Sequence, residues 1–468
     1  MTELENKNIS AQEGQSQSNG DYGLSPDLVF FLMEAISHGD IPRISDHIKK
    51  MRPADVADFI NQISPEQREV LVAAMSQTLD PVILVDLEPD IKDEIFERLG
   101  AEKSAEAITK LQSDDAMQVI EDLERPGRKQ ILDAMSDKDK AEMEAGLAYP
   151  EDSAGRMMNT NYIAIPKNWN VGQTIDFFRS DEKKDVPNDF YEIFVLSKHG
   201  RPTGGVLLSR VLRSSRETPI KEIMEKGLIT INANTDQEDV AYLFHKYDMV
   251  SVPVVDNNGK MVGIISVDDV VDVMEEEAEE DILHMGGITE TDLHSSLIET
   301  VKKRFLWLFI NLLTAVLASV VIAVFEGTIQ NLVALAVLMP IVASMGGNAG
   351  IQTVTVAVRG LATKELTLTN VRRIVGKEIM VGMINGLGFA LIVGVASYIL
   401  YQNFELSLVF AMAMVGAMII AGLAGVLIPI AFEKAGFDPA ITSGVFLTTV
   451  TDVVGFFMFL GLASLMLM

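Results

Sequence analysis

The sequence predicts a multidomain chain: an all-α N-terminal domain, a tandem pair of small α/β modules, a linker helix and an all-α domain of five transmembrane helices. Three observations support this prediction. Apolar residues recur at helical spacing in the first part of the chain, short β-branched runs then alternate with helical segments, and five long apolar stretches follow. A length of 468 residues leaves room for several domains.

Acidic charge is concentrated ahead of the apolar region. Of 38 basic and 66 acidic residues, nine and seven lie from Lys302 onward; this leaves 29 and 59 before it, a net charge of −30. Such a region repels nucleic acid, so we expect no nucleic-acid partner, and it attracts divalent cations. The alternative is that the acidity only keeps a soluble domain solvated.

Composition excludes several chemistries. Because the chain has no Cys, it has no disulfide framework, thiolate nucleophile or Cys-ligated zinc site. Six scattered His residues argue against a classical zinc or copper transporter. Residues 1–25 are rich in Asn, Gln, Ser and Gly without an apolar core, which predicts a disordered extension and neither a signal peptide nor an anchor.

Residues 26–150 are expected to form the helical N-domain. Apolar residues recur at helical spacing, and Pro or charged breaks separate the segments. Short helices are predicted at Val70–Met75, Ile91–Leu99, Ala116–Leu123 and Ile131–Met135. Similar units recur loosely at Pro53 and Ser113, which favours a small helical superstructure of unspecified geometry.

The next two segments, 151–218 and 219–282, read as a tandem α/β pair. The second contains Pro219–Met224, Ile229–Ile231, Val240–Tyr247, Ser251–Asp256 and Met261–Val270, interpreted as an αββαβ order. Asn257-Asn258-Gly259 predicts a hairpin turn between two strands. This segment closely resembles the CBS (cystathionine-β-synthase-type) domain, and the first is a weaker copy.

CBS domains usually occur in such pairs and act as regulatory modules. The resemblance implies that an Asp in a Ser/Thr-x-x-Asp motif contacts the ribose of an adenine nucleotide. Ser266 and Asp269 match that motif, which leaves ATP binding at the CBS pair open.

A dense acidic run leads toward the membrane region. It comprises Asp268, Asp269, Asp272, Glu275, Glu276, Glu277, Glu279, Glu280 and Asp281. Like charges along a helix repel one another, so the run is either a solvated face or a metal-binding surface; we favour the latter. Residues 283–304, with Leu293, Leu297 and Val301 at helical spacing, predict an amphipathic linker helix along the membrane surface.

Residues 305–468 predict a multi-pass domain in the lipid bilayer of a cell (inner) membrane. Each apolar stretch reaches the ~20 residues that a spanning helix needs. They run over 305–325, 332–358, 374–400, 406–432 and 440–468. With the N-terminus inside, all nine Lys and Arg from Lys302 onward fall on the cytoplasmic side, whereas the outside receives Glu326 and Glu405. We therefore expect a cytoplasmic N-terminus and an outside C-terminus.

The second apolar stretch carries polar side chains. Ser344, Asn348 and Gln352 are four residues apart and share one face if the backbone is helical. Pro340 and the glycines at 346, 347 and 350 allow a broken helix lining a cavity instead. A third reading is helix packing through small residues.

The fifth stretch places Thr448 and Asp452 one turn apart. A membrane carboxylate without a nearby Lys or Arg indicates a cation site, and the alternative is a protonated structural Asp. Hard oxygen ligands favour Mg²⁺ or Ca²⁺. Five helices enclose a pore poorly, so we expect a homodimer with two copies of Asp452 facing each other.

This arrangement of domains resembles the MgtE family of Mg²⁺ channels over about residues 50–468. The most specific matches are Tyr149–Met158, Gly346–Gln352 and Phe446–Asp452. The resemblance implies a homodimeric, Mg²⁺-selective channel that cytosolic Mg²⁺ closes, with Asp452 as the pore carboxylate and Asn348, Gln352 and Thr448 lining the pore.

The resemblance also implies regulatory Mg²⁺ ligands. They fall on Asp114, Asp236, Asp248, Asp269, Asp272, Glu277, Glu280, Asp281 and Asp438. In the N-domain, Gln118 stands where a second Asp is common in the family, which weakens the expected bridge from the N-domain to the CBS pair.

The sequence thus predicts Mg²⁺ uptake through a channel, with Mg²⁺ also acting as the regulatory ion. The main alternative is a carrier or antiporter for Co²⁺, Mn²⁺ or Ca²⁺ with nucleotide-sensing CBS domains. An enzyme is disfavoured because no nucleophile–base pair, metal motif or phosphate loop is evident. A chloride channel is disfavoured by the pore carboxylate.

Overall fold

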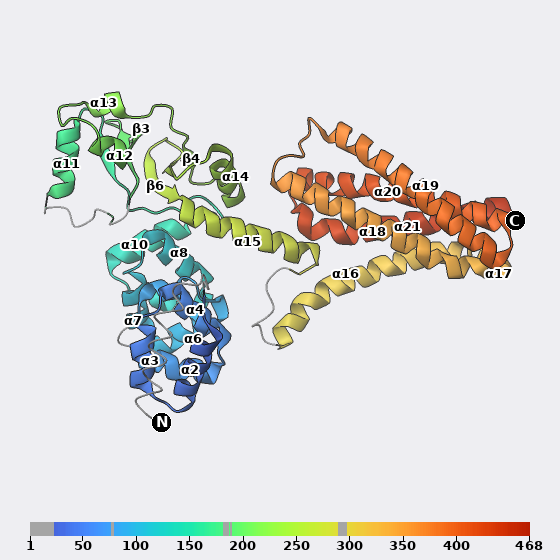
Figure 1. Cartoon of the computed structure of the whole chain (residues 1–468), viewed down its shortest axis with the longest axis horizontal. Coiled ribbons are helices and arrows are strands. Elements are labelled where there is room, and N and C mark those ends of the chain that lie inside the picture. Colours follow the sequence, from blue (N-terminus) through green and yellow to red (C-terminus); the bar gives the residue numbers. More distant parts are fainter. Residues whose placement is uncertain (1–22, 76–78, 181–186, 188–189, 289–296) are drawn as a thin grey trace. The chain divides into compact units, whose positions relative to one another are not determined.

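The computed structural model describes residues 23–75, 79–180, 187, 190–288 and 297–468. These residues divide into two compact units, Met1–Val271 and Asp272–Met468 (Figure 1). Helix α15 (Val267–Met285) contains the boundary between the two units. The predicted extension falls largely outside the described residues.

Within residues 23–75 and 79–147, the first unit consists of helices that share one apolar core. Several helices begin at a proline, whose missing N–H is not needed in the first turn. The elements are α2 (Pro26–Ser37), α3 (Ile41–Ile48), α4 (Pro53–Gln62), α5 (Pro65–Met75), a 3-10 turn (Pro81–Leu84), α6 (Pro89–Leu99), α7 (Ala101–Ile108), α8 (Ser113–Asp122), α9 (Arg125–Ala134) and α10 (Asp137–Leu147). All four short helices expected from the sequence are present.

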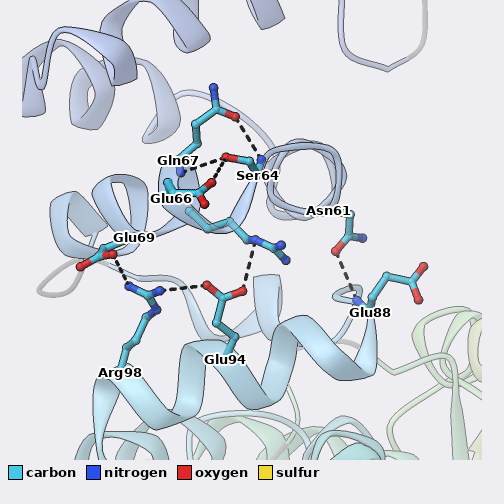
Figure 2. Close-up of polar contacts among 9 residues, drawn as sticks. Asn61, Ser64, Glu66, Gln67, Glu69, Glu88, Glu94 and Arg98 are labelled. Atoms are coloured by element: carbon cyan, nitrogen blue, oxygen red, sulfur yellow. Dashed lines mark hydrogen bonds and ion pairs between the residues drawn. The ribbon is translucent and has the colours of Figure 1, made fainter. Parts of the chain in front are cut away.

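Polar side chains also join these helices, as Figure 2 shows for α4, α5 and α6. Arg98 lies within 3.1 Å of Glu94 and 3.3 Å of Glu69, while the Asn61 side chain accepts a bond from the Glu88 N–H. Since the glutamates are paired with arginine, we interpret these contacts as structural, of small energetic weight at the surface.

Two three-stranded sheets follow, and they have the same topology. Their orders are β1-β2-β3 and β4-β5-β6, with the first pair of strands parallel and the second antiparallel in each. The first module contains β1 (Ala164–Pro166), α11 (Val171–Arg179), β2 (Glu192–Leu196), β3 (Pro202–Leu207) and α12 (Leu208–Leu212). The second contains α13 (Ile220–Ile223), β4 (Ile231–Asn232), α14 (Gln237–Tyr247), β5 (Ser251–Val255) and β6 (Met261–Ser266). The repeated topology confirms a tandem pair.

One detail of the second module was predicted incorrectly. Its order is helix, strand, helix, strand, strand, not αββαβ. The expected turn at 257–259 does join β5 to β6, and Gly259 supplies a positive φ of 77°. Because this turn makes the last two strands adjacent, α14 precedes both of them.

In its described residues, 272–288 and 297–468, the second unit is helical, and five of these helices are long and apolar enough to span a membrane. The elements after α15 are α16 (Leu297–Val324), α17 (Glu326–Asn331), α18 (Ala334–Ala362), α19 (Val371–Tyr401), α20 (Phe404–Ala435) and α21 (Pro439–Leu467). Figure 1 shows α18, α20 and α21 running together, with α19 packed on α20. The predicted linker lies partly outside the described residues: 283–285 belong to α15 and 297–304 to α16.

Candidate functional site

Helix α21 carries the acidic residue predicted for the pore. Ser443, Leu447 and Thr451 form its buried face, and Leu447 and Thr451 lie against Gly350 and Gly346 of α18. The Thr448 hydroxyl donates to backbone oxygens of its own helix, which leaves its oxygen able to accept. One turn on, Asp452 is only partly buried. Asp452, the predicted pore carboxylate, and Thr448, a predicted pore-lining residue, therefore share a face beside the packed one.

Helix α18 is continuous, so the helical reading of the second apolar stretch is correct. Ser344, Asn348 and Gln352 lie on its exposed side, about half a turn from the packed Gly346 and Gly350. The small-residue reading therefore holds for these two glycines. Among the described residues, no hydrogen bond joins Asn348 or Gln352 to Asp452 within the single chain.

A second membrane carboxylate escaped the sequence analysis. Glu378 lies two turns inside α19 and accepts a hydrogen bond of 3.4 Å from the Thr353 hydroxyl of α18. Its backbone oxygen faces Gly422 of α20. An acidic residue inside an apolar stretch was the signal that could have identified it.

Near the other end of α21, Asp438 caps the helix, and its Oδ1 accepts a 2.7 Å bond from the Ala440 N–H. Its Oδ2 lies 2.8 Å from Nδ1 of the buried His284. Nε2 of His284 is 3.4 Å from Glu280. Burial, and then the charge of Asp438, raise the pKa of Asp281, which His284 partly offsets. Three predicted ligands thus gather around His284.

In the first unit, Asp114 and Asp269 come together although they are distant in sequence. Burial, followed by the charge of Asp115, raises the pKa of Asp114 to about 6. Burial, followed by the charge of Asp114, raises the pKa of Asp269 to about 7. The predicted bridge from the N-domain to the CBS pair therefore has a carboxylate on each side.

The proposed nucleotide motif has a local role in the structure. The Ser266 N–H and hydroxyl both donate to one carboxylate oxygen of Asp269, at 3.2 and 2.7 Å. These bonds hold Asp269 at the start of α15, where its charge interacts with that of Asp114. They do not test ribose binding.

A further carboxylate pair joins the Tyr149–Met158 motif to α14. Asp236 is the N-cap of α14, and its charge contributes, after burial, to raising the pKa of Asp152. Asp152 itself was not anticipated as a site residue. Asp248, at the other end of α14, is its C-cap with a left-handed φ of 50°, a role that Asn and Asp fill readily.

The remaining predicted ligands, Asp272 and Glu277, lie on α15 and take part in other polar or electrostatic interactions. Within the described ranges, no three His, Asp or Glu side chains converge on a position that could hold a metal ion. The recurring motif is instead a pair of carboxylates from distant segments, as in Asp114 with Asp269. A pair suits Mg²⁺, which commonly binds one or two carboxylates and keeps several waters.

Comparison with family models assigns three parts of the chain. Residues 339–462 match the MgtE model, described as a divalent cation transporter. Residues 51–152 match the MgtE intracellular N domain, and residues 220–276 match the CBS domain.

Relatives named magnesium transporter MgtE extend over almost the whole chain. One from Thermus thermophilus is 32% identical, covering 94% of this chain and 98% of the relative, and one from Bacillus subtilis is 27% identical over 94% and 97%. A solved structure of the cytosolic domain of the Mg²⁺ channel MgtE in complex with ATP is 28% identical, covering 53% of this chain and all of its own, with a TM-score of 0.48. On this sequence evidence, the chain belongs to the MgtE family.

Proposed function

We propose that this chain forms a homodimeric, Mg²⁺-selective channel that mediates magnesium uptake and closes when cytosolic Mg²⁺ binds its acidic pairs. As a member of the MgtE family, it is a multi-pass membrane transporter and not an enzyme. Magnesium as the transported ion is supported by the relatives, all named for it.

Uptake needs no energy input beyond the membrane potential. Moving one charge across 100 mV is worth about 2.3 kcal/mol, so a divalent cation gains about 4.6 kcal/mol when the inside is negative. Asp452 supplies a carboxylate partway along α21, with Thr448 one turn away. In a dimer, two such carboxylates would attract a cation that retains part of its water shell.

Closure is supported chiefly by the carboxylate pairs. Asp114 with Asp269, Asp152 with Asp236, and Asp281 with Asp438 each combine charges from distant segments, and in each pair the pKa of at least one member is raised. Two ionised carboxylates in partly buried surroundings repel each other. A divalent ion between them would turn that repulsion into attraction, so the compact form is favoured when cytosolic Mg²⁺ is abundant.

We propose ATP only as a ligand of the CBS pair, with Ser266 and Asp269 as its candidate contacts. It is supported by the motif and by the related cytosolic domain that was solved with ATP. Nucleotide would then bind close to the Asp114–Asp269 pair and could change its affinity for Mg²⁺.

The test is an inside-out membrane patch with Mg²⁺ as the charge carrier. The wild type should show unitary currents that disappear as Mg²⁺ on the cytoplasmic face rises from micromolar to millimolar levels. Asp452→Asn should abolish the currents, because it removes the only carboxylate that the sequence supplies within α21. Glu405→Gln, which neutralises an exposed acid at the start of α20, is the matched control and should conduct normally.

Two results would contradict the proposal. Tracer flux without unitary currents would identify a carrier and would reopen the identity of the ion. Currents that persist at high cytoplasmic Mg²⁺ would be consistent with a channel but would contradict the sensing role of the acidic pairs.

A further inference from the structure

The last two residues of α15 contact the helices of the membrane unit directly. His284 is 5% exposed, and its Nδ1 lies 2.8 Å from Oδ2 of Asp438. Because an ionised carboxylate can only accept, Nδ1 carries the proton and donates. The contact joins positions 154 residues apart in the chain.

Asp438 is also the N-cap of α21. Its second oxygen, Oδ1, accepts from the Ala440 N–H at 2.7 Å. One carboxylate therefore both begins this helix and accepts the bond from His284. Asp452 lies fourteen residues farther along the same helix, about 21 Å at 1.5 Å per residue. A displacement of Asp438 is thus transmitted to the helix that carries Asp452.

Met285 supplies an apolar contact beside this polar one. It packs on a buried cluster from three membrane helices, α18, α20 and α21, made of Val354, Val358, Ala424, Ala440 and Leu447. The carbonyl oxygen of Met285 also lies against Gly444 of α21, 3.7 Å from where a Cβ would stand.

We infer that His284 and Met285 form a metal-independent latch between the acidic helix α15 and the pore helix α21. This inference rests on the proposed function: His284 and Met285 would transmit Mg²⁺ regulation from α15 to the pore helix. His284 is a positioning residue: it acts through Asp438 and does not contact the transported ion. The latch holds the end of α15 against α21. A movement of α15 on Mg²⁺ binding therefore displaces the helix that carries Asp452.

Two conservative variants distinguish the contributions of the two ring nitrogens of His284. The amide nitrogen of Asn occupies nearly the place of Nδ1, so His284→Asn should keep the bond to Asp438. The amide nitrogen of Gln corresponds to Nε2, so His284→Gln should keep only the contact with Glu280. His284→Ala removes both, and Met285→Ala removes the apolar contact.

The first readout is inhibition by cytoplasmic Mg²⁺ in inside-out patches. His284→Ala and His284→Gln should need about tenfold more Mg²⁺ for half-inhibition, the factor expected from losing one bond to a charged group. His284→Asn should stay near the wild type. Unitary conductance should not change, since Asp452 is untouched. A merely structural role for His284 would not distinguish Asn from Gln in this way.

The second readout does not depend on transport. Because the chain lacks Cys, Gly444→Cys introduces a single thiol beneath Met285. Without Mg²⁺, a water-soluble maleimide should label this thiol slowly in the Gly444→Cys background and several-fold faster when His284→Ala or Met285→Ala is added. The His284→Asn addition should label slowly.

The outcomes separate the two proposals. Equal labelling rates, together with unchanged half-inhibition in His284→Ala, would overturn the latch. A wild type that conducts but is insensitive to Mg²⁺ would refute the sensing function, and the labelling rates would still decide whether the latch exists.

Discussion

Glu192 is a half-buried carboxylate that lies outside every predicted metal site. It starts β2 and accepts a 2.9 Å hydrogen bond from the Ser251 hydroxyl of β5, so it joins the two CBS modules. Burial, and then the charge of Glu225, raise its pKa above 4.5 despite that bond. The raised pKa shows that removing this carboxylate from water disfavours its charged form, at a position where no metal ion is expected to compensate.

We expect Glu192→Gln to stabilise the first unit at neutral pH. Glutamine keeps an oxygen that accepts from Ser251 but carries no charge to desolvate. Since the folded pKa of Glu192 is raised, the contribution of this group to stability is fully present below its unfolded pKa, 4.5, and is lost as pH rises through the folded pKa. The melting temperature of the variant should therefore exceed that of the wild type by an amount that grows from pH 4.5 upward and then levels off.

Fluorescence of Trp169, which packs on the core of the same module, can report this melting once Trp307→Phe removes the other tryptophan. Glu217→Gln changes an exposed acid of the first module and should melt like the wild type. A constant difference between Glu192→Gln and wild type from pH 4.5 to 8 would show that Glu192 is not the titrating group.

Residue types alone did not indicate which acids meet. Resemblance implied Asp114, Asp236, Asp269 and Asp438 singly, and the structure supplies electrostatic partners for them. Asp152 and His284 were missed because their roles depend on tertiary contacts with segments far away in the chain. Glu378, in contrast, was visible in the sequence as an acid within an apolar stretch and was overlooked.

At the scale of elements, α19 and α20 pack through glycines. A Cβ at Gly382 would stand 2.6 Å from the backbone oxygen of Met418, and one at Gly386 would stand 2.9 Å from the Cα of Val415. Backbone atoms cannot move aside as a flexible side chain can. Small residues four apart are what allow membrane helices to approach this closely.

We therefore expect Gly382→Ala to force α19 away from α20. Overpacking of this kind costs about 1–3 kcal/mol, which should lower the melting temperature of the detergent-solubilised chain by several degrees. Gly388→Ala is the matched control on the same helix, because nothing lies within 4 Å of the Cβ position there. If both variants melted together with the wild type, the close α19–α20 contact would not exist in the membrane.

Elements were easier to predict than their internal geometry. The five spans follow from length and apolarity, and each predicted stretch corresponds to one long helix. Whether Pro340 breaks α18 did not follow, because a membrane helix tolerates proline when neighbours satisfy its backbone. The order error in the second CBS module concerns the place of α14 alone, because the turn that joins β5 to β6 was predicted correctly.

At the scale of the whole molecule, the charge distribution predicts an orientation in the membrane. Nine Lys and Arg from Lys302 onward all fall at one end of the five spans, and an odd number of spans puts the two termini on opposite sides. With the N-terminus inside, every carboxylate pair in the soluble unit faces the cytosol. That is the compartment whose Mg²⁺ the proposed sensor must read.

The Cys-free sequence allows this orientation to be tested with single thiols. Gln330→Cys in α17 and Glu405→Cys in the first turn of α20 lie on the expected outer side, whereas Glu365→Cys, between α18 and α19, and Glu433→Cys, in the last turn of α20, lie on the expected cytoplasmic side. All four positions are exposed and no basic residue is lost. A membrane-impermeant maleimide should label the first two in intact cells and the second two only in inside-out vesicles. The reverse pattern would put the acidic unit outside, where it could not respond to cytosolic Mg²⁺, and would refute the sensing function along with the topology. Labelling of all four from one side would mean that the helices between them do not cross the bilayer as single spans.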